Sequence, residues 1–172
     1  MRAPLILALA VFAAAAPAVS ACKAKGPDVA QMKAASDPSQ TRFLTNNAKA
    51  PGVVTLPSGL QYEVVKSGPA AGPHPKSGDE IKVHYEGTLI DGTVFDSTFK
   101  SGNPSVLELD GLVQAWQEAL PLMRPGDEWF LYVPAKLGYG DRGAGGVIPP
   151  GATLIFRMQL LGVLSHGEQA AG

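Results

Sequence analysis

The sequence predicts an α+β fold, an antiparallel β-sheet of five to six strands that curves around one short α-helix. Several short segments alternate apolar and polar residues, which is the period of half-buried strands. One segment, residues 112–120, instead repeats apolar residues at the spacing of a helix with a single buried stripe. Strands that precede and follow one helix, joined by hairpins, favour an antiparallel sheet packed on that helix.

Length and charge limit the domain count and the partners. The chain has 172 residues, of which 45% are hydrophobic, so it can bury one core of ordinary size and is expected to form a single domain. The formal net charge is -1 and no basic block is present. The electrostatic footprint of a nucleic-acid binder is therefore missing, and we expect no DNA or RNA partner.

The first 21 residues are typical of a secretory signal peptide. Arg2 gives a positive start, and residues 5–16 are an apolar run too short to span a membrane. Residues 19–21 and the only cysteine, Cys22, together resemble the lipobox of bacterial lipoprotein precursors, in which cleavage exposes the cysteine for lipid attachment. We expect an exported protein of the bacterial envelope (periplasm), anchored to the membrane by a lipid at Cys22. The alternative is a plain signal sequence that leaves a free thiol.

Residues 22–52 are predicted to be a flexible tether with at most one short helix. Helix formers gather at residues 29–35, and residues 37–39, Asp-Pro-Ser, are expected to stop that helix. Phe43 and Leu44 either pack on the edge of the domain or stay partly exposed. The tether is too polar to fold by itself.

The globular domain is expected at residues 53–165, with a disordered tail at 166–172. After a turn at residues 55–59, the strands are predicted at residues 60–66, 79–90, 105–109, 126–133 and 153–163. In the second of these, Ile81, Val83 and Tyr85 face the core. Asp91-Gly92 is a strong hairpin signal because glycine supplies the positive φ of such turns, and the chain returns through Phe95 and Asp96.

The helix at residues 112–120 carries Leu112, Val113 and Trp116 on one face. Asp110 is expected to cap its N-terminus, and Pro121 to end it. Each aromatic residue of the domain has core filling as its plain alternative, since position and spacing alone do not separate core from pocket.

Residues 134–151 form the least ordinary segment. Six of these eighteen residues are glycine, yet Tyr139, Val147 and Ile148 lie among them. We expect these three side chains to turn back onto an apolar surface, either lining a pocket or only fastening the loop to the sheet. The glycine run is not a phosphate cradle, because no GK[ST] ends it and no helix obviously follows.

Five segments resemble the successive motifs of the FKBP family, the tacrolimus-binding peptidyl-prolyl cis-trans isomerases. They are TLPSGLQY (55–62), VHYEGTLIDGTVFDST (83–98), LDGLVQAW (109–116), LGYGDRG (137–143) and IPPGATLIF (148–156). The resemblance covers residues 55–164. The opening at residues 52–62 is similar to that of exported bacterial members, including the macrophage infectivity potentiator type.

The resemblance implies an FKBP-like fold, X-Pro isomerase activity and a pocket with Trp116 as its floor. The implied catalytic residues are Tyr85, Phe95, Asp96, Trp116, Tyr139 and Phe156, and the implied substrate-binding residues are Leu107, Leu112, Val113 and Ile148. It further implies that the Ile148 N–H and the Tyr139 hydroxyl hold substrate carbonyls, while Asp96 orients Tyr85 or a polarised substrate carbonyl. Ala115 departs from the family pattern, where glycine is commoner, and its methyl group is expected to narrow the site.

Other chemistry has little support in the sequence. His74, His84 and His166 are far apart along the chain, so we expect no metal site. No GxSxG elbow is present and Cys22 lies outside the domain, which leaves nucleophilic catalysis without a candidate. We expect no cofactor.

The expected partners are proline-containing, unfolded or partly folded exported proteins, with macrolides of the tacrolimus or rapamycin type as inhibitors. A monomer is expected, because the N-terminal extension is much shorter than the helical dimerisation arm of the infectivity-potentiator type. The second functional hypothesis is a non-enzymatic chaperone or adaptor that binds unfolded chains through the same pocket.

Overall fold

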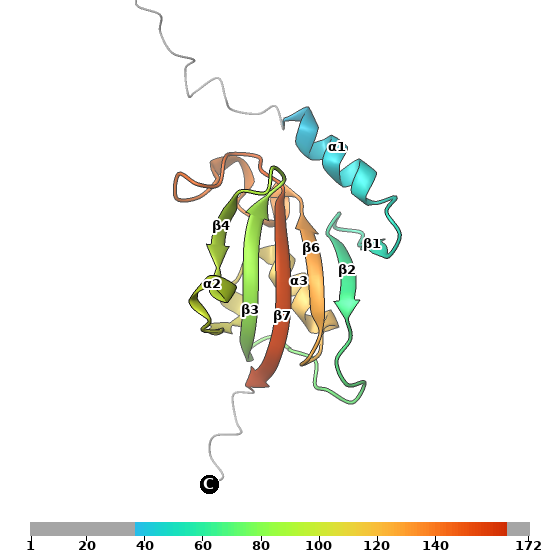
Figure 1. Ribbon diagram of the computed structural model, residues 1–172, viewed down its shortest axis with the longest axis vertical. Helices are drawn as coiled ribbons and strands as arrows, with labels where there is room; N and C mark the ends of the chain where they lie inside the picture. The colour runs from blue at the N-terminus through green and yellow to red at the C-terminus, as the bar shows by residue number, and fades with distance from the viewer. Residues whose placement is uncertain (1–36, 165–172) are drawn as a thin grey trace, which may run out of the picture.

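The computed structural model describes residues 37–164, which form one antiparallel sheet with short helices around it (Figure 1). Within these residues the sheet has seven strands in the order β1-β2-β6-β7-β3-β4, and β5 also pairs with β3. The strands are β1 (Val53–Thr55), β2 (Gln61–Lys66), β3 (Glu80–Leu89), β4 (Val94–Ser97), β5 (Ser105–Glu108), β6 (Glu128–Val133) and β7 (Leu154–Leu164). The predicted fold class is confirmed, and the strand beyond the expected number is the three-residue β1.

The helices are short and lie around the sheet. They are α1 (Pro38–Asn47), α2 (Thr98–Ser101) and α3 (Gln114–Ala119), with 3₁₀ turns at Leu109–Gly111, Leu120–Leu122, Ala135–Leu137 and Gly140–Arg142. Figure 1 shows α3 on the far side of the sheet, behind β3, β7 and β6. Between residues 37 and 164, none of the helices has the length and apolar character needed to cross a membrane.

The centre of the sheet is the long antiparallel pair β3 and β7. Ile81 and Val83 are fully buried while Lys82 between them is exposed, as the alternation predicted. The hairpin after β3 is also confirmed: Gly92 has φ 87°, and the N–H of Thr93 donates to the carboxylate of Asp91 at 2.8 Å. This turn returns the chain into β4 along the edge of β3.

The core lies between α3 and the concave face of the sheet. From α3, Ala115, Trp116 and Ala119 are buried. They are packed in one cluster with inward residues of the strands, among them Ile81, Val83, Leu131, Val133, Leu154, Phe156, Met158 and Leu160. The alternation in β6 is regular, because Trp129, Leu131 and Val133 are buried and the residues between them are not.

The helix at the centre is shorter than predicted, and its cap is not Asp110. Residues 112 and 113 are extended, with ψ of 169° and 147°, so the chain enters α3 only at Gln114. Asp110 instead accepts hydrogen bonds from the Ser77 hydroxyl and the Gly78 N–H, both at 2.9 Å. Its carboxylate therefore ties the loop before β3 to the segment before α3.

Residues 37–39 begin a helix instead of stopping one, so that prediction is wrong. The carboxylate of Asp37 accepts the N–H of Ser39 at 2.9 Å, and this hydrogen bond lowers the pKa of Asp37. Pro38 occupies the first helical turn, where its missing N–H costs nothing. The helix predicted at residues 29–35 lies outside the described residues, as do Cys22, the signal segment and residues 165–172.

α1 is fastened to the domain mainly by polar contacts, since none of its residues is buried. The carboxamide of Gln61 donates to the Leu44 carbonyl and accepts from the Asn47 side chain, both at 2.9 Å. At the other end of the helix, the Gln40 side-chain oxygen accepts the N–H of Thr153 at 2.8 Å. Part of the predicted tether is thus a helix docked on the domain.

Candidate active site

A pocket of about 340 Å³ opens between α3, the β3–β4 hairpin and the loop before β7. Its lining residues are Tyr85, Phe95, Asp96, Leu107, Gly111, Leu112, Val113, Trp116, Tyr139 and Phe156. Every residue predicted for the site is among them except Ile148, and Gly111 joins them. Residues that lie as much as 71 positions apart in the chain, Tyr85 and Phe156, thus share one apolar cavity because β3 pairs with β7.

Four aromatic rings form the floor and one side of the pocket. Trp116 from α3 is 4% exposed and meets Tyr85 at a centroid distance of 5.0 Å and an angle of 77°. Phe156 meets Trp116 at 5.2 Å and 85°, and Phe95 meets Phe156 at 5.7 Å and 88°. Such edge-to-face contacts are favourable. All four rings line the pocket, with Phe95 held through its contact with Phe156.

Gly87, which was not predicted as a site residue, makes this arrangement possible. A Cβ atom at Gly87 would lie 2.4 Å from Cζ of Phe95 and 3.0 Å from Cε1 of Phe156. The absent side chain therefore provides the space in which Phe95 packs against β3. The available signal was a glycine inside a strand, which often marks a close approach of another group.

The polar part of the pocket is the pair Tyr85 and Asp96. The Tyr85 hydroxyl donates to Oδ2 of Asp96 at 2.6 Å. The two residues are close because Asp96 on β4 pairs with Gly87, two positions beyond Tyr85 on β3. Burial raises the pKa of Tyr85, and the hydrogen bond to Asp96 raises it further, so the hydroxyl keeps its proton and remains a donor.

Ile148 lies outside the pocket lining, and its N–H is already engaged. The side chain is 6% exposed and belongs to the core cluster. Its N–H donates to the carbonyl of Ala144 at 3.0 Å, and its carbonyl accepts the Ala144 N–H at 3.0 Å. At the pocket itself, no acceptor in the described part of the chain bonds the N–H of Val113, the residue that precedes α3.

The loop at residues 134–151 combines both alternatives that its sequence left open. Tyr139 lines the pocket and is 40% exposed, whereas Ile148 is buried and fastens the loop to the core. Val147 does neither, since it is 56% exposed. Ala115 is fully buried and does not line the pocket, so its methyl group packs into the core and does not narrow the site as expected.

Other sites in the described residues have weaker support. A larger hollow of about 570 Å³ lies between the start of α1, the β3–β4 turn and residues 149–153. It is lined by Asp37, Asp91 and prolines and contains no aromatic side chain, so we place the chemistry in the smaller aromatic pocket. Between residues 37 and 164, no three metal-ligating side chains come together.

Comparison with known proteins identifies the family to which this fold and pocket belong. Residues 72–161 match the family described as FKBP-type peptidyl-prolyl cis-trans isomerase, and residues 11–64 match the domain amino terminal to it. The chain belongs to the FKBP-type peptidyl-prolyl cis-trans isomerase family. The resemblance inferred from the five motifs is confirmed.

Among its relatives, peptidyl-prolyl cis-trans isomerase Mip of Coxiella burnetii is 50% identical over 121 residues, which are 70% of this chain and 52% of the relative. Outer membrane protein MIP of Legionella longbeachae is 49% identical over 121 residues, 70% of this chain and 51% of the relative. The crystal structure of FkpA from Escherichia coli has a TM-score of 0.74 and 37% identity, covering 79% of this chain and 64% of that one. The chain spans about half the length of the two curated relatives.

Proposed function

We propose that this protein is a peptidyl-prolyl cis-trans isomerase that accelerates X-Pro isomerisation in exported proteins without a metal or a covalent intermediate. The observation that carries the proposal is the aromatic pocket above Trp116, which is open and has the Tyr85–Asp96 pair at its side. A pyrrolidine ring is small and apolar and fits a recess of about 340 Å³ together with its neighbouring peptide groups.

The mechanism follows from the nature of the barrier. Resonance keeps the X-Pro amide planar, and rotation crosses about 18–20 kcal/mol. The planar form is charge-separated and more polar than the twisted form, so a dry apolar pocket disfavours the planar form more. Tighter binding of the twisted imide is differential stabilisation of the transition state, and no bond has to be made or broken.

The polar groups of the pocket position the substrate. We assign the Tyr139 hydroxyl to one substrate carbonyl, and Asp96 to orienting Tyr85 or a polarised carbonyl. For the backbone donor that was expected at Ile148, the Val113 N–H is the better candidate, because the Ile148 N–H would first have to leave the Ala144 carbonyl. Each gain of about 1.4 kcal/mol in the transition state is tenfold in rate.

A proline-limited refolding assay tests the proposal against the chaperone alternative. An isomerase accelerates the slow phase at amounts far below those of the refolding protein, and a tacrolimus-type macrolide that fills the pocket suppresses the effect. A holdase alters refolding only at stoichiometric amounts. A slow phase unchanged by catalytic amounts of a folded, pure preparation would reject the isomerase.

We further propose that the mature protein is a monomer in the bacterial envelope, anchored by a lipid on Cys22. The Val-Ser-Ala-Cys run at residues 19–22 and the outer-membrane name of the Legionella longbeachae relative support this location. Intact mass spectrometry of protein from a bacterial membrane fraction tests the anchor. An unmodified Cys22, or a chain that starts elsewhere, would exclude the lipid.

A further inference from the structure

The backbone of Tyr85 lacks the β-sheet partner that the register of its strand calls for. β3 and β4 pair Gly87 with Asp96 and Glu86 with Ser97, so the next pair would be Tyr85 with Thr98. At Thr98, however, the chain turns into α2, and its backbone leaves the sheet. The N–H and carbonyl of Tyr85 on this side would then have no partner, at the residue that walls the pocket.

The side chain of Thr98 fills both positions. Its hydroxyl accepts the N–H of Tyr85 at 2.8 Å and donates to the Tyr85 carbonyl at 3.1 Å. Thr98 is 7% exposed, so water does not readily replace these two bonds. The Thr98 hydroxyl thus replaces the backbone groups of a neighbouring strand as the hydrogen-bond partner of Tyr85.

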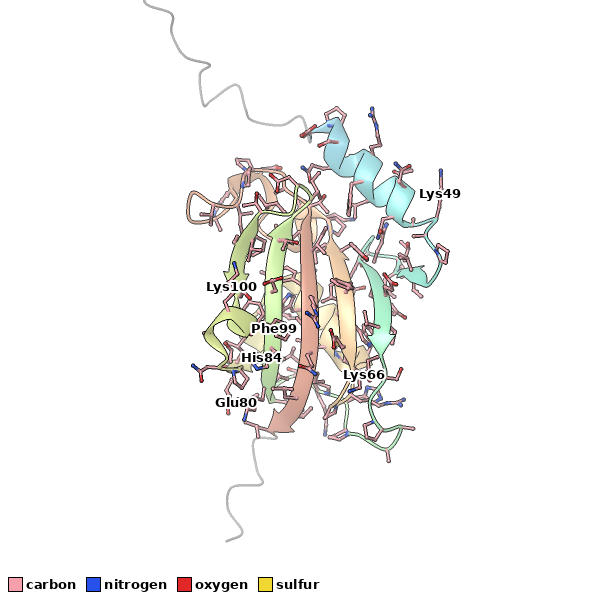
Figure 2. All side chains as sticks on the ribbon, viewed as in Figure 1. Lys49, Lys66, Glu80, His84, Phe99 and Lys100 are labelled. Atoms are coloured by element: carbon pink, nitrogen blue, oxygen red, sulfur yellow. The ribbon has the colours of Figure 1, made fainter. Side chains whose placement is uncertain are left out.

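His84 completes the bonding of this hydroxyl from the outer face of the sheet. Its Nδ1 lies 3.0 Å from the Thr98 oxygen. We assign the hydroxyl hydrogen to the bond with the Tyr85 carbonyl, which leaves a lone pair for an N–H at Nδ1 of His84. The imidazole is in turn held against the Phe99 ring, at 5.0 Å and 19°, and Figure 2 shows these two labelled side chains together. The guanidinium of Arg157 lies 4.9 Å above the same ring.

We propose that Thr98 is a positioning residue for isomerisation, which fixes the backbone of Tyr85 so that its hydroxyl reaches Asp96 at the edge of the pocket. The proposal rests on the isomerase activity proposed above. Thr98 does not line the pocket but bonds the backbone of Tyr85, so its effect passes through Tyr85. His84 supports it by holding the Thr98 hydroxyl in the orientation that serves both Tyr85 groups.

The main test compares Thr98→Val, which keeps the shape and removes the hydroxyl, with Thr98→Ser, which keeps the hydroxyl. We expect kcat/KM to fall about tenfold in Thr98→Val and to stay within about twofold of the wild type in Thr98→Ser. Ser101→Ala is the control for loosening of the short helix. It removes the hydrogen bond from the Ser101 hydroxyl to the Thr98 carbonyl but leaves both bonds of the Thr98 hydroxyl to Tyr85, so its kcat/KM should not change.

A double-mutant comparison separates positioning from general loosening. In a Tyr85→Phe background, where the hydroxyl that Thr98 serves is gone, adding Thr98→Val should change kcat/KM by less than about twofold. An equal loss in both backgrounds would overturn the proposal, as would a Thr98→Val variant with wild-type activity. His84→Ala should give a smaller loss than Thr98→Val.

Amide hydrogen exchange gives a readout that does not need activity. In the wild type the Tyr85 amide should exchange slowly, and in Thr98→Val it should exchange at least tenfold faster while amides of β6 stay protected. If Thr98→Val does not fold, Thr98→Ala replaces it, and an unprotected Tyr85 amide in the wild type alone refutes the positioning role. An inactive wild type with a protected Tyr85 amide would instead reject the proposed function and leave the contact standing.

Discussion

The two tryptophans of the domain are both buried, but only Trp116 lines the aromatic pocket. Trp116 is 4% exposed and Trp129 is 5% exposed. In both, the indole N–H is buried and has no partner within the described residues. Each also contacts a tyrosine on a neighbouring strand, Tyr85 for Trp116 and Tyr62 for Trp129. The two tryptophans are thus alike in burial, in the unpartnered indole N–H and in the contact with a tyrosine.

The difference lies in the orientation of the neighbouring rings. Tyr62 stacks on Trp129 at 4.5 Å and 14°, so it covers a face of the indole. Tyr85 and Phe156 meet Trp116 in edge-to-face contacts, at 77° and 85°, and all three rings line the pocket. The two clusters thus differ in how a tyrosine meets the indole: it is stacked at Trp129 and edge-to-face at Trp116, where the pocket opens.

The largest effect on activity is expected from Phe95→Ala, which removes one of the perpendicular walls. Loss of aromatic contact worth about 1.5–3 kcal/mol corresponds to a fall in kcat/KM of about 10- to 100-fold. The control is Phe130→Ala, because Phe130 lies between buried residues of β6 and so faces away from the pocket. Refolding kinetics with a proline-limited substrate measure both. If the two variants were equally active, Phe95 would have no role as a wall of the pocket.

Asp96→Ala should follow, with a loss of about tenfold in kcat/KM in a variant that remains folded. The variant leaves the Tyr85 hydroxyl without its acceptor, and a hydrogen bond to a charged group contributes about 1.5–3 kcal/mol. Asp91→Asn on the same hairpin changes a carboxylate that does not line the pocket and should be neutral for activity. Full activity of both Asp96→Ala and Phe95→Ala would end the assigned roles.

Gly87→Ala should reduce kcat/KM by about two- to tenfold, because the new methyl group pushes Phe95 away from its position. Moving a packed ring off its rotamer costs about 0.5–1.5 kcal/mol. Gly162→Ala on β7 is the control, since its Cβ would meet no atom within 4 Å. If Gly87→Ala and Gly162→Ala isomerise at the same rate, the space at Gly87 is not needed.

The smallest effect on activity is expected from Trp129→Phe. Stability should fall by about 1–2 kcal/mol, the cost of losing part of a buried ring, while kcat/KM stays within about twofold. Trp116→Phe should lower kcat/KM more than Trp129→Phe at a similar loss of stability. Urea unfolding measures the free energy of unfolding, and the refolding assay measures kcat/KM. A large loss of activity in Trp129→Phe would mean that the surroundings of Trp129 and the pocket at Trp116 are coupled.

The sheet was predictable because its signals are local. Alternation in β3 and the Asp91-Gly92 turn depend only on neighbouring residues, and both are confirmed. The helix starts were not predictable in the same way. Asp37 followed by proline can stop one helix or begin another, and the contacts of α1 with Gln61 and Thr153, both distant in the chain, favour the second. Asp110 was drawn away from α3 by Ser77 and Gly78, which are distant in the chain.

The membership of the pocket was largely predictable from the motifs, and its internal geometry was not. The Tyr139 and Ile148 side chains share one loop, yet they face different surroundings, because the Ala144 bridge turns Ile148 into the core. Gly87 leaves room for the Phe95 ring, and Thr98 bonds the backbone of Tyr85. Neither residue belongs to a type or pattern that predicts a site from the sequence. Such residues emerge only when distances are known.

The contact between Gln40 and Thr153 has a practical consequence for shortening the chain. Thr153 is almost fully buried directly before β7, and its hydroxyl already lacks a partner within the described residues. A chain that starts at residue 53 would lack Gln40, so the Thr153 N–H would also lose its hydrogen-bond acceptor. Thr153 lies only three positions before Phe156 of the pocket. Recombinant material intended for crystallisation or inhibitor screening should therefore retain the helix together with its cap, from Asp37 onward.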